Sequence, residues 1–435
     1  MAVASGSHTH PEHRGPTVAG APSTDEQDLQ QVLAGVRAGA ARLRAVPVDQ
    51  LIARVDRVVQ RWLEPGSPWM ENAVQLLGAS TGFHPRMLAH ALPFQLELLH
   101  AAALEDLLRR EFGRPSGVDV PQWPTQLVVH VLAGNIPGLA AVPICLGLVA
   151  KQATVIKPAS GDPLFAQLFH ESLCELDPEL AAAVAVVSWR GGDRRVENTV
   201  FSNADVVVAM GGFDALRSLS AQLGRKLRAL GPRLSFAFVG RDVLESEATA
   251  DAWARAVAYD VSVWDQRGCL SPQLVFVETG GIFGPAEFSE LLAAHLQAWL
   301  EPLPCRSLTP EEQAAIRAFR DEAEWQPGAR LLASRGDLAW SIAIEPEPRF
   351  VPTCLHRCVR VQSVADVETL VSLLAPHRAW LEGAGLGVQK ERFPWIKALL
   401  CSIGVHWVTP LGRMQRPTLE WCPGGRPRIV DWICQ

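Results

Sequence analysis

The spacing of apolar residues divides the chain into two parts. From Asp28 to Phe112, apolar residues recur every three or four positions, which predicts amphipathic helices. Beyond Pro121 and Pro124 the pattern changes to short runs rich in β-branched residues, separated by segments of helix length. These runs are the expected strands, and they span Gln126–Leu132, Ala153–Ile156, Val184–Ser188, Asp205–Met210 and Leu234–Val239. Apolar strands that alternate with helices predict a parallel, doubly wound sheet.

A second α/β unit follows this sheet. A helical stretch from Ala248 to Trp264 leads into a further strand, Gln273–Val277, which begins a second lobe. The expected architecture is a two-lobed enzyme with a cleft between the lobes. Residues 1–25 are rich in Gly, Pro, Ser, Thr and His, and we expect them to form a flexible tail.

Composition excludes several classes of protein. The 435 residues, 48% of them apolar, suffice for two or three domains with large cores. Forty basic against 46 acidic residues give a net charge of −6, which lacks the basic excess of nucleic-acid-binding proteins. The longest apolar run, Gly138 to Ala150, is too short for a membrane span, and the N-terminus lacks the apolar core of a secretory signal. We therefore expect a cytoplasmic protein whose nine cysteines are reduced.

Three candidate binding motifs lie at strand ends. Ala133–Pro137 follows the first strand, where Asn135 either turns its amide into the cleft or caps a helix. Lys157 ends the next strand, where it either meets the ribose or 2′-phosphate of a dinucleotide or stays solvated. Met210–Gly212 precedes a helix, and its glycines either admit a phosphate or serve the turn alone.

The candidate nucleophile is Cys269, in the segment DQRGCLSPQ between a helix and a strand. Reactive residues concentrate on such connections, and the nearby Arg267 can stabilise a thiolate. A lone free cysteine is more often a small buried hydrophobe, so Cys269 is a weak candidate by itself. No metal site is expected, because one segment offers three possible ligands without the fourth that structural zinc needs: Cys354, His356 and Cys358.

Taken together and in this order, the motifs resemble those of the aldehyde dehydrogenase superfamily. Within this superfamily, the amino-acid sequence is similar to that of the LuxC-type acyl-CoA reductases over Gln126 to Glu278 and again from Gly404 onward. The stretches that carry this resemblance are HVLAGNIPG, VIKPASGDPLF, ADVVVAMGG, LGPRLSFAFV, VWDQRGCLSPQ and GRMQRPTLEW.

The resemblance implies a fold, an activity and a set of site residues. The implied fold has two doubly wound parallel-sheet lobes, one for the cofactor and one for catalysis, after a helical N-terminal region. The implied activity is NADPH-dependent reduction of an acyl thioester, carried by CoA or a carrier protein, to the aldehyde. Cys269 would be the nucleophile and Asn135 the oxyanion donor. The expected cofactor-binding residues are Lys157, Ser160, Gly134, Gly191, Gly192, Gly211 and Gly212.

Three departures from the superfamily pattern refine this prediction. Ala229 stands where the general-base Glu is expected, so hydrolysis of an acyl-enzyme should be poor. No counterpart of the E-x-F-G-P motif is evident near Leu355–Val361. Ser160 replaces a Glu that would repel a 2′-phosphate, which together with Lys157 favours NADPH.

The resemblance also implies a domain division and partners. The expected domains are a helical region over 26–120, a nucleotide-binding domain over 121–242, a catalytic domain over 243–403, and a segment over 404–435 that packs back on the nucleotide-binding domain. A homo-oligomer or a complex with acyl-handling enzymes is expected. The alternatives are an acyl-phosphate reductase, an NAD(P)-dependent aldehyde dehydrogenase, and a catalytically silent scaffold or binding subunit.

Overall fold

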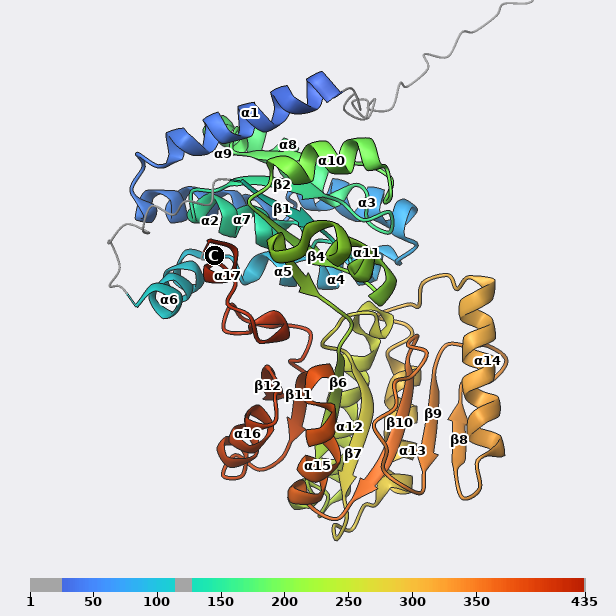
Figure 1. Ribbon diagram of the computed structural model, residues 1–435. Coiled ribbons are helices and arrows are strands. Elements are labelled where there is room, and N and C mark those ends of the chain that lie inside the picture. The colour runs from blue at the N-terminus through green and yellow to red at the C-terminus, as the bar shows by residue number, and fades with distance from the viewer. Residues whose placement is uncertain (1–25, 114–126, 434–435) are drawn as a thin grey trace, which may run out of the picture.

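The computed structural model describes residues 26–113 and 127–433 and consists of two lobes, one above the other in Figure 1. The predicted tail, 1–25, lies outside the described residues. The chain begins with helices that were predicted from apolar spacing: α1 (Glu26–Leu43), α2 (Val48–Leu63), α3 (Pro68–Thr81), α4 (Pro85–Ala91), α5 (Phe94–Glu97) and α6 (Ala101–Phe112). These helices are not a separate unit, because their buried side chains share one hydrophobic core with the first sheet.

The first sheet is wholly parallel and has the strand order β3-β2-β1-β4-β5. Its strands are β1 (Leu127–Val131), β2 (Ala153–Lys157), β3 (Val184–Val186), β4 (Val206–Met210) and β5 (Leu227–Leu230). The helices between them are α7 (Ala141–Val149), α8 (Phe165–Leu176), α9 (Pro178–Ala181), α10 (Arg194–Asn203) and α11 (Phe213–Leu223). The crossovers through helices are what parallel strands require.

The second sheet has the order β12-β11-β6-β7-β10-β9-β8, parallel except where β8 meets β9. Its strands are β6 (Leu234–Val239), β7 (Pro272–Glu278), β8 (Arg330–Ala333), β9 (Ser341–Glu345), β10 (Cys358–Val364), β11 (Leu381–Gly387) and β12 (Trp407–Pro410). Helices α12 (Glu247–Ser262) and α13 (Pro285–Ala298) share a core on one face, and α15 (Val367–Leu374) and α16 (Phe393–Ser402) on the other. Helix α14 (Pro310–Trp325) covers β8 and β9.

One strand was assigned to the wrong sheet from sequence. We expected Leu234–Val239 to continue the nucleotide-binding sheet, but β6 lies between β11 and β7 in the second sheet. The chain crosses between the lobes at Gly231–Arg233, directly before this strand. An apolar strand buried on both faces looks the same in either sheet, so the pattern alone does not assign it.

The two sheets meet through opposite edges. Asn135 and Gly211 follow β1 and β4, at the carboxyl edge of the first sheet. Cys269 precedes β7 and Glu382 is the second residue of β11, at the amino edge of the second sheet. All four residues line one cavity, so the chemistry lies where the carboxyl edge of one sheet faces the amino edge of the other.

The C-terminal segment contacts both lobes. Strand β12 extends the second sheet beside β11, and the chain then returns to the first lobe, where α17 (Val430–Ile433) contacts β4. The Glu111 carboxylate of α6 accepts hydrogen bonds from the backbone N–H groups of Arg428, Ile429 and Val430, at 2.5, 2.8 and 2.9 Å. These contacts fix the segment against the helical region. No helix of the described residues is both long and apolar enough to cross a membrane.

Two glycines of α1 test how closely this helix packs on the first lobe. An added Cβ at Gly39 would overlap the carbonyl oxygen of Ala182, whereas one at Gly35 would meet nothing within 4 Å. We expect Gly39→Ala to lower the free energy of unfolding by about 1–3 kcal/mol, as overpacking does. Gly35→Ala should raise it by about 0.5–1 kcal/mol, because alanine favours the helix. Urea unfolding of both variants measures these free energies. An equal change in the two variants would contradict the close packing of Gly39 against Ala182.

Candidate active site

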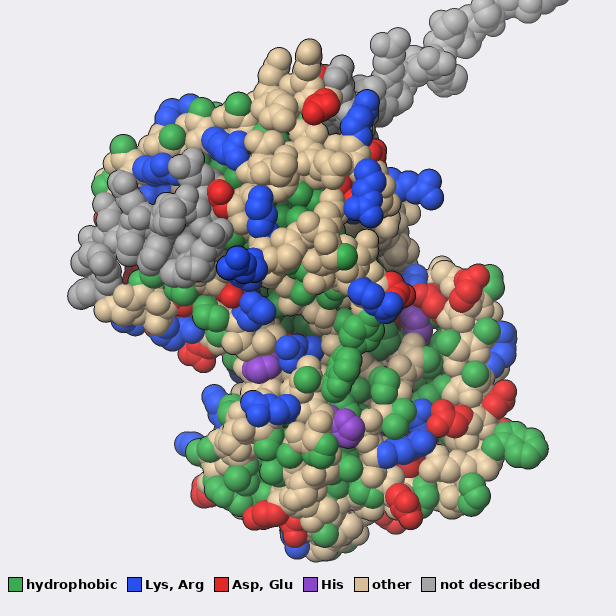
Figure 2. Space-filling view, viewed as in Figure 1, with side chains coloured by type: hydrophobic (Ala, Val, Ile, Leu, Met, Phe, Trp, Pro, Cys, Tyr) green, Lys and Arg blue, Asp and Glu red, His purple; other side chains and the backbone are tan. Residues whose placement is uncertain are grey.

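A cavity of about 760 Å³ lies between the lobes and is lined by residues of both. In the space-filling view the surface is hollowed at this level, and Lys and Arg side chains gather around the hollow (Figure 2). Several of the predicted site residues belong to its lining: Gly134, Asn135, Ser160, Gly211, Gly212 and Cys269. Lys157, Gly191 and Gly192 do not belong to it.

The backbone around Cys269 is held in place by Ser235. The Ser235 hydroxyl donates to the carbonyl oxygen of Cys269 at 2.7 Å and accepts from the backbone N–H of Gly383 at 3.0 Å. The start of β11 approaches Leu270 so closely that a Cβ at Gly383 would lie 2.9 Å from Leu270 Cδ2. One hydroxyl therefore fixes the Cys269 turn against the residue that follows Glu382.

The Cys269 side chain is open to the cavity, yet many protein atoms of the two lobes lie around it and displace water. This desolvation, with a smaller contribution from the charge of Glu382, raises the pKa of the Cys269 thiol to about 12. Backbone N–H groups and the charge of Arg428 act in the opposite direction. The resting thiol is therefore protonated at neutral pH, and its ionisation depends on the charges around it.

Asn135 and the Cys269 turn are joined by a reciprocal pair of hydrogen bonds across the lobes. Asn135 Nδ2 donates to the carbonyl oxygen of Arg267 at 2.8 Å, and Arg267 Nε donates to the carbonyl oxygen of Asn135 at 3.3 Å. An amide nitrogen carries two hydrogens, so the second N–H of Asn135 is available to a ligand in the cavity. We expected Arg267 to stabilise the Cys269 thiolate, but its guanidinium instead donates to Glu312 at 2.9 Å.

Two strained turns lie behind this contact. Trp264, Asp265 and Gln266 have φ of 59°, 48° and 64°, in the left-handed region that side chains rarely adopt. A second left-handed run of similar φ consists of Leu355, His356 and Arg357. Such backbone persists only where its surroundings over-determine it.

Buried polar contacts join the two turns. Arg357 Nε donates to Asp265 Oδ1 at 2.9 Å. The Gln266 amide donates to the carbonyl oxygen of Cys358 at 2.9 Å and accepts from its N–H at 3.1 Å. Because Arg267 directly follows the first turn and Leu355 begins the second, these contacts position two residues of the cavity wall.

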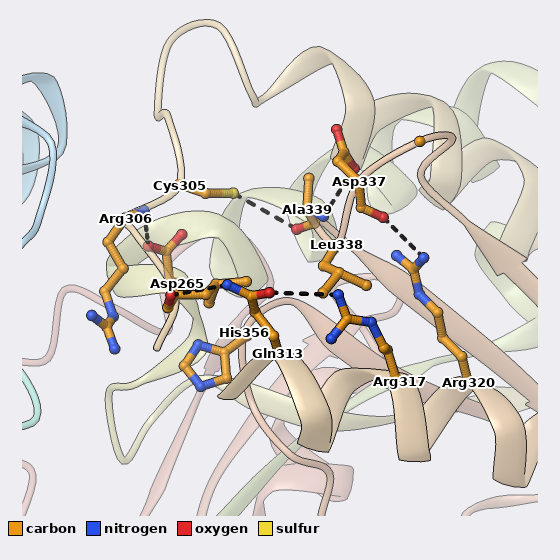
Figure 3. Close-up of a pocket in the computed structure, with 12 residues that line it drawn as sticks. Asp265, Cys305, Arg306, Gln313, Arg317, Arg320, Asp337, Leu338, Ala339 and His356 are labelled. Carbon is orange, nitrogen blue, oxygen red and sulfur yellow. Dashed lines mark hydrogen bonds between the residues drawn. The ribbon is translucent and has the colours of Figure 1, made fainter. Parts of the chain in front are cut away.

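A second cavity, of about 700 Å³, lies on the other side of these turns beside α14 (Figure 3). Its wall includes Asp265 and His356 from the turns, and Arg306 and Arg320. Arg306 pairs with Glu312, and Arg320 donates to the carbonyl oxygens of Asp337 and Trp340 at 2.9 and 3.1 Å. Both arginines therefore already have partners in the protein. Among the described residues, no group of three or more His, Cys, Asp or Glu side chains is placed to hold a metal ion.

The cavity has room for a nucleotide phosphate beside the first sheet. A Cβ at Gly212, the residue that caps the N-terminus of α11, would meet nothing within 4 Å. Gly134 and Gly161 approach each other so closely that a Cβ on Gly134 would lie 2.9 Å from Gly161 Cα. The glycines thus leave backbone exposed at a helix N-terminus, which suits a phosphate group. Lys157 lies apart, with Nζ 5.8 Å from the centre of the Trp189 ring.

Sequence reasoning missed several charged residues of the cavity wall, among them Arg233, Glu382 and Arg428. Glu382 is 3% exposed and accepts from Trp421 Nε1 at 2.7 Å and from the N–H of Gly424 at 3.1 Å. Burial raises its pKa. The feature of the sequence that could have identified Glu382 is its position as an isolated carboxylate at the start of the apolar run LEGAGLG. Ala229, by contrast, is exposed on β5 and is not part of the cavity lining.

The chain is similar to known reductases. A family model described as acyl-CoA reductase (LuxC) matches residues 43–421. A long-chain acyl-protein thioester reductase of Photobacterium phosphoreum is 26% identical over 339 residues, which are 74% of this chain and 67% of that protein. The enzyme of the same name from Vibrio harveyi is 26% identical over 352 residues, 77% of this chain and 72% of that protein.

Among solved structures, a benzaldehyde dehydrogenase of Corynebacterium glutamicum superposes with a TM-score of 0.69 at 14% identity, covering 88% of this chain and 86% of that one. Aldehyde dehydrogenase C of Pseudomonas syringae gives 0.66 at 14% identity, covering 93% and 90%.

The fold is therefore that of the aldehyde dehydrogenases, and the predicted fold class is confirmed. More particularly, the chain belongs to the LuxC acyl-CoA reductase family, as the sequence motifs indicated. It is an oxidoreductase, and family and fold together imply a nicotinamide cofactor.

The charge of Glu382 gives a test of the Cys269 environment. Glu382→Gln removes a negative charge that raises the pKa of the thiol, so the thiolate fraction should increase. We expect alkylation of Cys269 by iodoacetamide at pH 9 to become up to about tenfold faster, the factor for one pKa unit. Asp431→Asn is the control, because Asp431 is a carboxylate of the same cavity wall. A labelling rate unchanged in Glu382→Gln would show that the two groups are not coupled.

Proposed function

We propose that this protein reduces an acyl thioester to the aldehyde with NADPH, through an acyl group bound covalently to Cys269. The observation that supports this most is the placement of Asn135 and Cys269 on one cavity wall, joined through Arg267, in a chain of the LuxC family.

In the first step, the Cys269 thiol loses its proton to solvent, and the resulting thiolate attacks the carbonyl carbon of the thioester. The free N–H of Asn135 Nδ2 and the backbone N–H of Cys269 stabilise the oxyanion. The carbon–sulfur bond to the carrier then breaks, and the carrier thiolate takes up a proton and leaves. One thioester is exchanged for another, so the acyl-enzyme forms with little change in free energy.

In the second step, the acyl-enzyme is reduced. A dihydronicotinamide held in the cavity would supply the hydride that the carbonyl carbon of the Cys269 thioester takes up. Asn135 holds the resulting oxyanion of the thiohemiacetal, as in the first step. The carbon–sulfur bond to Cys269 breaks as the carbonyl reforms, the aldehyde is released, and the Cys269 thiolate is ready for another acyl group.

The nucleotide would lie against Gly134, Ser160, Gly211 and Gly212, all of which line the cavity. The exposed Ser160 offers no negative charge against a 2′-phosphate, which favours NADPH over NADH. We assign Lys157 and the Gly191–Gly192 turn to the outer part of this site, where a half-buried lysine at the end of β2 supplies positive charge.

The acyl donor is a thioester of CoA or of a protein-bound phosphopantetheine, which present the same reactive arm. The relatives from Photobacterium phosphoreum and Vibrio harveyi are named as acyl-protein thioester reductases, which favours a protein donor in them. By analogy we propose a cytoplasmic enzyme that works as a homo-oligomer or with an acyl-handling partner.

The proposed function is tested by following NADPH absorbance with a panel of acyl-CoAs. We expect oxidation that depends on acyl chain length, is abolished in Cys269→Ala and falls about 10²–10³-fold in Asn135→Ala. A reaction with acyl phosphates alone would identify an acyl-phosphate reductase. A Cys269→Ala variant with full activity would refute the covalent route.

Nucleotide preference is tested at Ser160. Ser160→Glu places a carboxylate beside the expected 2′-phosphate, so the ratio of kcat/KM for NADPH to that for NADH should fall about 10–100-fold, the scale of one desolvated like-charge contact. Ser160→Gln introduces a side chain of the same size as glutamate but without its charge, so this variant should retain most of the wild-type ratio of kcat/KM values. An equal loss in both variants would indicate steric obstruction and no role for charge at this position.

A further inference from the structure

The cavity extends away from Cys269 across one face of the first sheet. In the strand register His130 lies opposite Val208, and Val208 lies opposite Arg228. Residues opposite each other in neighbouring strands share a face. The next row, nearer to the carboxyl edge of the sheet, pairs Met210 with Leu230. Since all five residues line the cavity, this branch is apolar next to the reaction site and polar one row further in.

The polar row contains a buried histidine, His130, that stands apart from its neighbours in its hydrogen bonding. His130 is 1% exposed, and neither ring nitrogen has a hydrogen-bond partner among the described residues. Its ring packs edge-on against Trp432 of the C-terminal helix, with the ring centres 4.6 Å apart. Burial lowers its pKa to about 3, so the imidazole is neutral and offers one donor and one acceptor.

The charged groups that face this row are already paired. Arg228 Nε donates to the carbonyl oxygen of Asp431 at 3.0 Å and lies 3.7 Å from its carboxylate. His130 is therefore the group at this end of the branch that gains most from a ligand. Buried polar atoms without partners are rare in folded proteins, and their presence in a cavity wall points to a ligand that satisfies them.

His130 is within reach of an acyl chain held on Cys269. Asn135, whose amide bonds to the Cys269 turn, follows His130 by five residues, and five extended residues span at most about 18 Å. The intervening wall is formed by Leu132, Met210 and Leu230, which suit methylene groups.

We propose that the acyl chain of the substrate lies in this branch and carries a hydroxyl group that hydrogen-bonds to His130. This inference rests on the proposed function and names its substrate class. A hydroxyl both donates and accepts, so it matches either tautomer of a neutral imidazole. A terminal carboxylate does not fit, because the nearby cation, Arg228, is paired with Asp431. A plain alkyl chain leaves the imidazole unpaired.

The test compares hydroxyacyl and alkyl ligands of equal length, with the hydroxyl at successive carbons. Non-reducible S-alkyl-CoA thioethers give Kd by calorimetry, and the matching thioesters give kcat/KM with NADPH. We expect the hydroxylated ligand to be favoured about tenfold at one position of the hydroxyl, because a site with a buried polar group discriminates against a ligand that cannot pair with it.

Three variants locate the effect. His130→Leu should bring the ratio of hydroxylated to plain ligand close to one, and His130→Gln, which can still form hydrogen bonds, should retain part of it. His170→Leu makes the same exchange in α8, outside the cavity lining, and should retain the wild-type ratio. The Tm of His130→Leu should be no lower than that of the wild type, because an unpaired buried polar group is removed.

The outcomes separate this inference from the proposed function. A wild-type ratio near one at every hydroxyl position, or a ratio that persists in His130→Leu, overturns the assignment and indicates that water satisfies the imidazole. A clear preference among thioethers without reduction of any thioester supports the binding site while contradicting the proposed reductase activity.

Discussion

The contact between Asn135 and the Cys269 turn is the constraint on which the rest of the site depends. The two residues come from different sheets, and the reciprocal hydrogen bonds between Asn135 and Arg267 fix the edge of one sheet against that of the other. Behind this contact, the left-handed turns at 264–266 and 355–357 are held together by the Asp265–Arg357 pair. The strain of these turns is offset by buried polar contacts, which hold the Cys269 turn against Asn135.

The same geometry sets the electrostatics of the cavity. Enclosure by two lobes desolvates Cys269 and favours its protonated form, and the carboxylate of Glu382 adds to this effect, while Arg428 opposes it. Glu382 and Arg428 are both tied to the C-terminal segment: Glu382 accepts from Trp421, and Arg428 donates to the carbonyl oxygen of Trp421. The segment that returns to the first lobe therefore carries one charge that acts on the thiol, Arg428, and contacts the other, Glu382 of β11.

Features that depend on residues close together along the chain could be predicted from sequence, whereas features that depend on contacts between distant segments could not. Local periodicity identified the helices before Phe112 and the strands β1 to β4 of the first sheet, but it missed β5. The motif order led to Asn135 and Cys269 on one cavity wall. The strand Leu234–Val239 was placed in the wrong sheet, because burial on both faces looks alike in either lobe. Glu382 and His130 were missed, since each joins the cavity only through pairing between distant segments. Lys157, at a matching motif position, lies outside the cavity lining, which spacing along the chain cannot reveal.

The central claim is that Cys269 accepts the acyl group before reduction. The most direct measurement is the intact mass of the protein after incubation with an acyl-CoA and no nicotinamide nucleotide, followed by peptide mapping. We expect a mass increase of one acyl group, located on Cys269, absent in Cys269→Ala and lost on addition of NADPH with release of aldehyde. An unmodified protein that still oxidises NADPH with the same acyl-CoA, or an acyl group on another cysteine that NADPH removes, would contradict it.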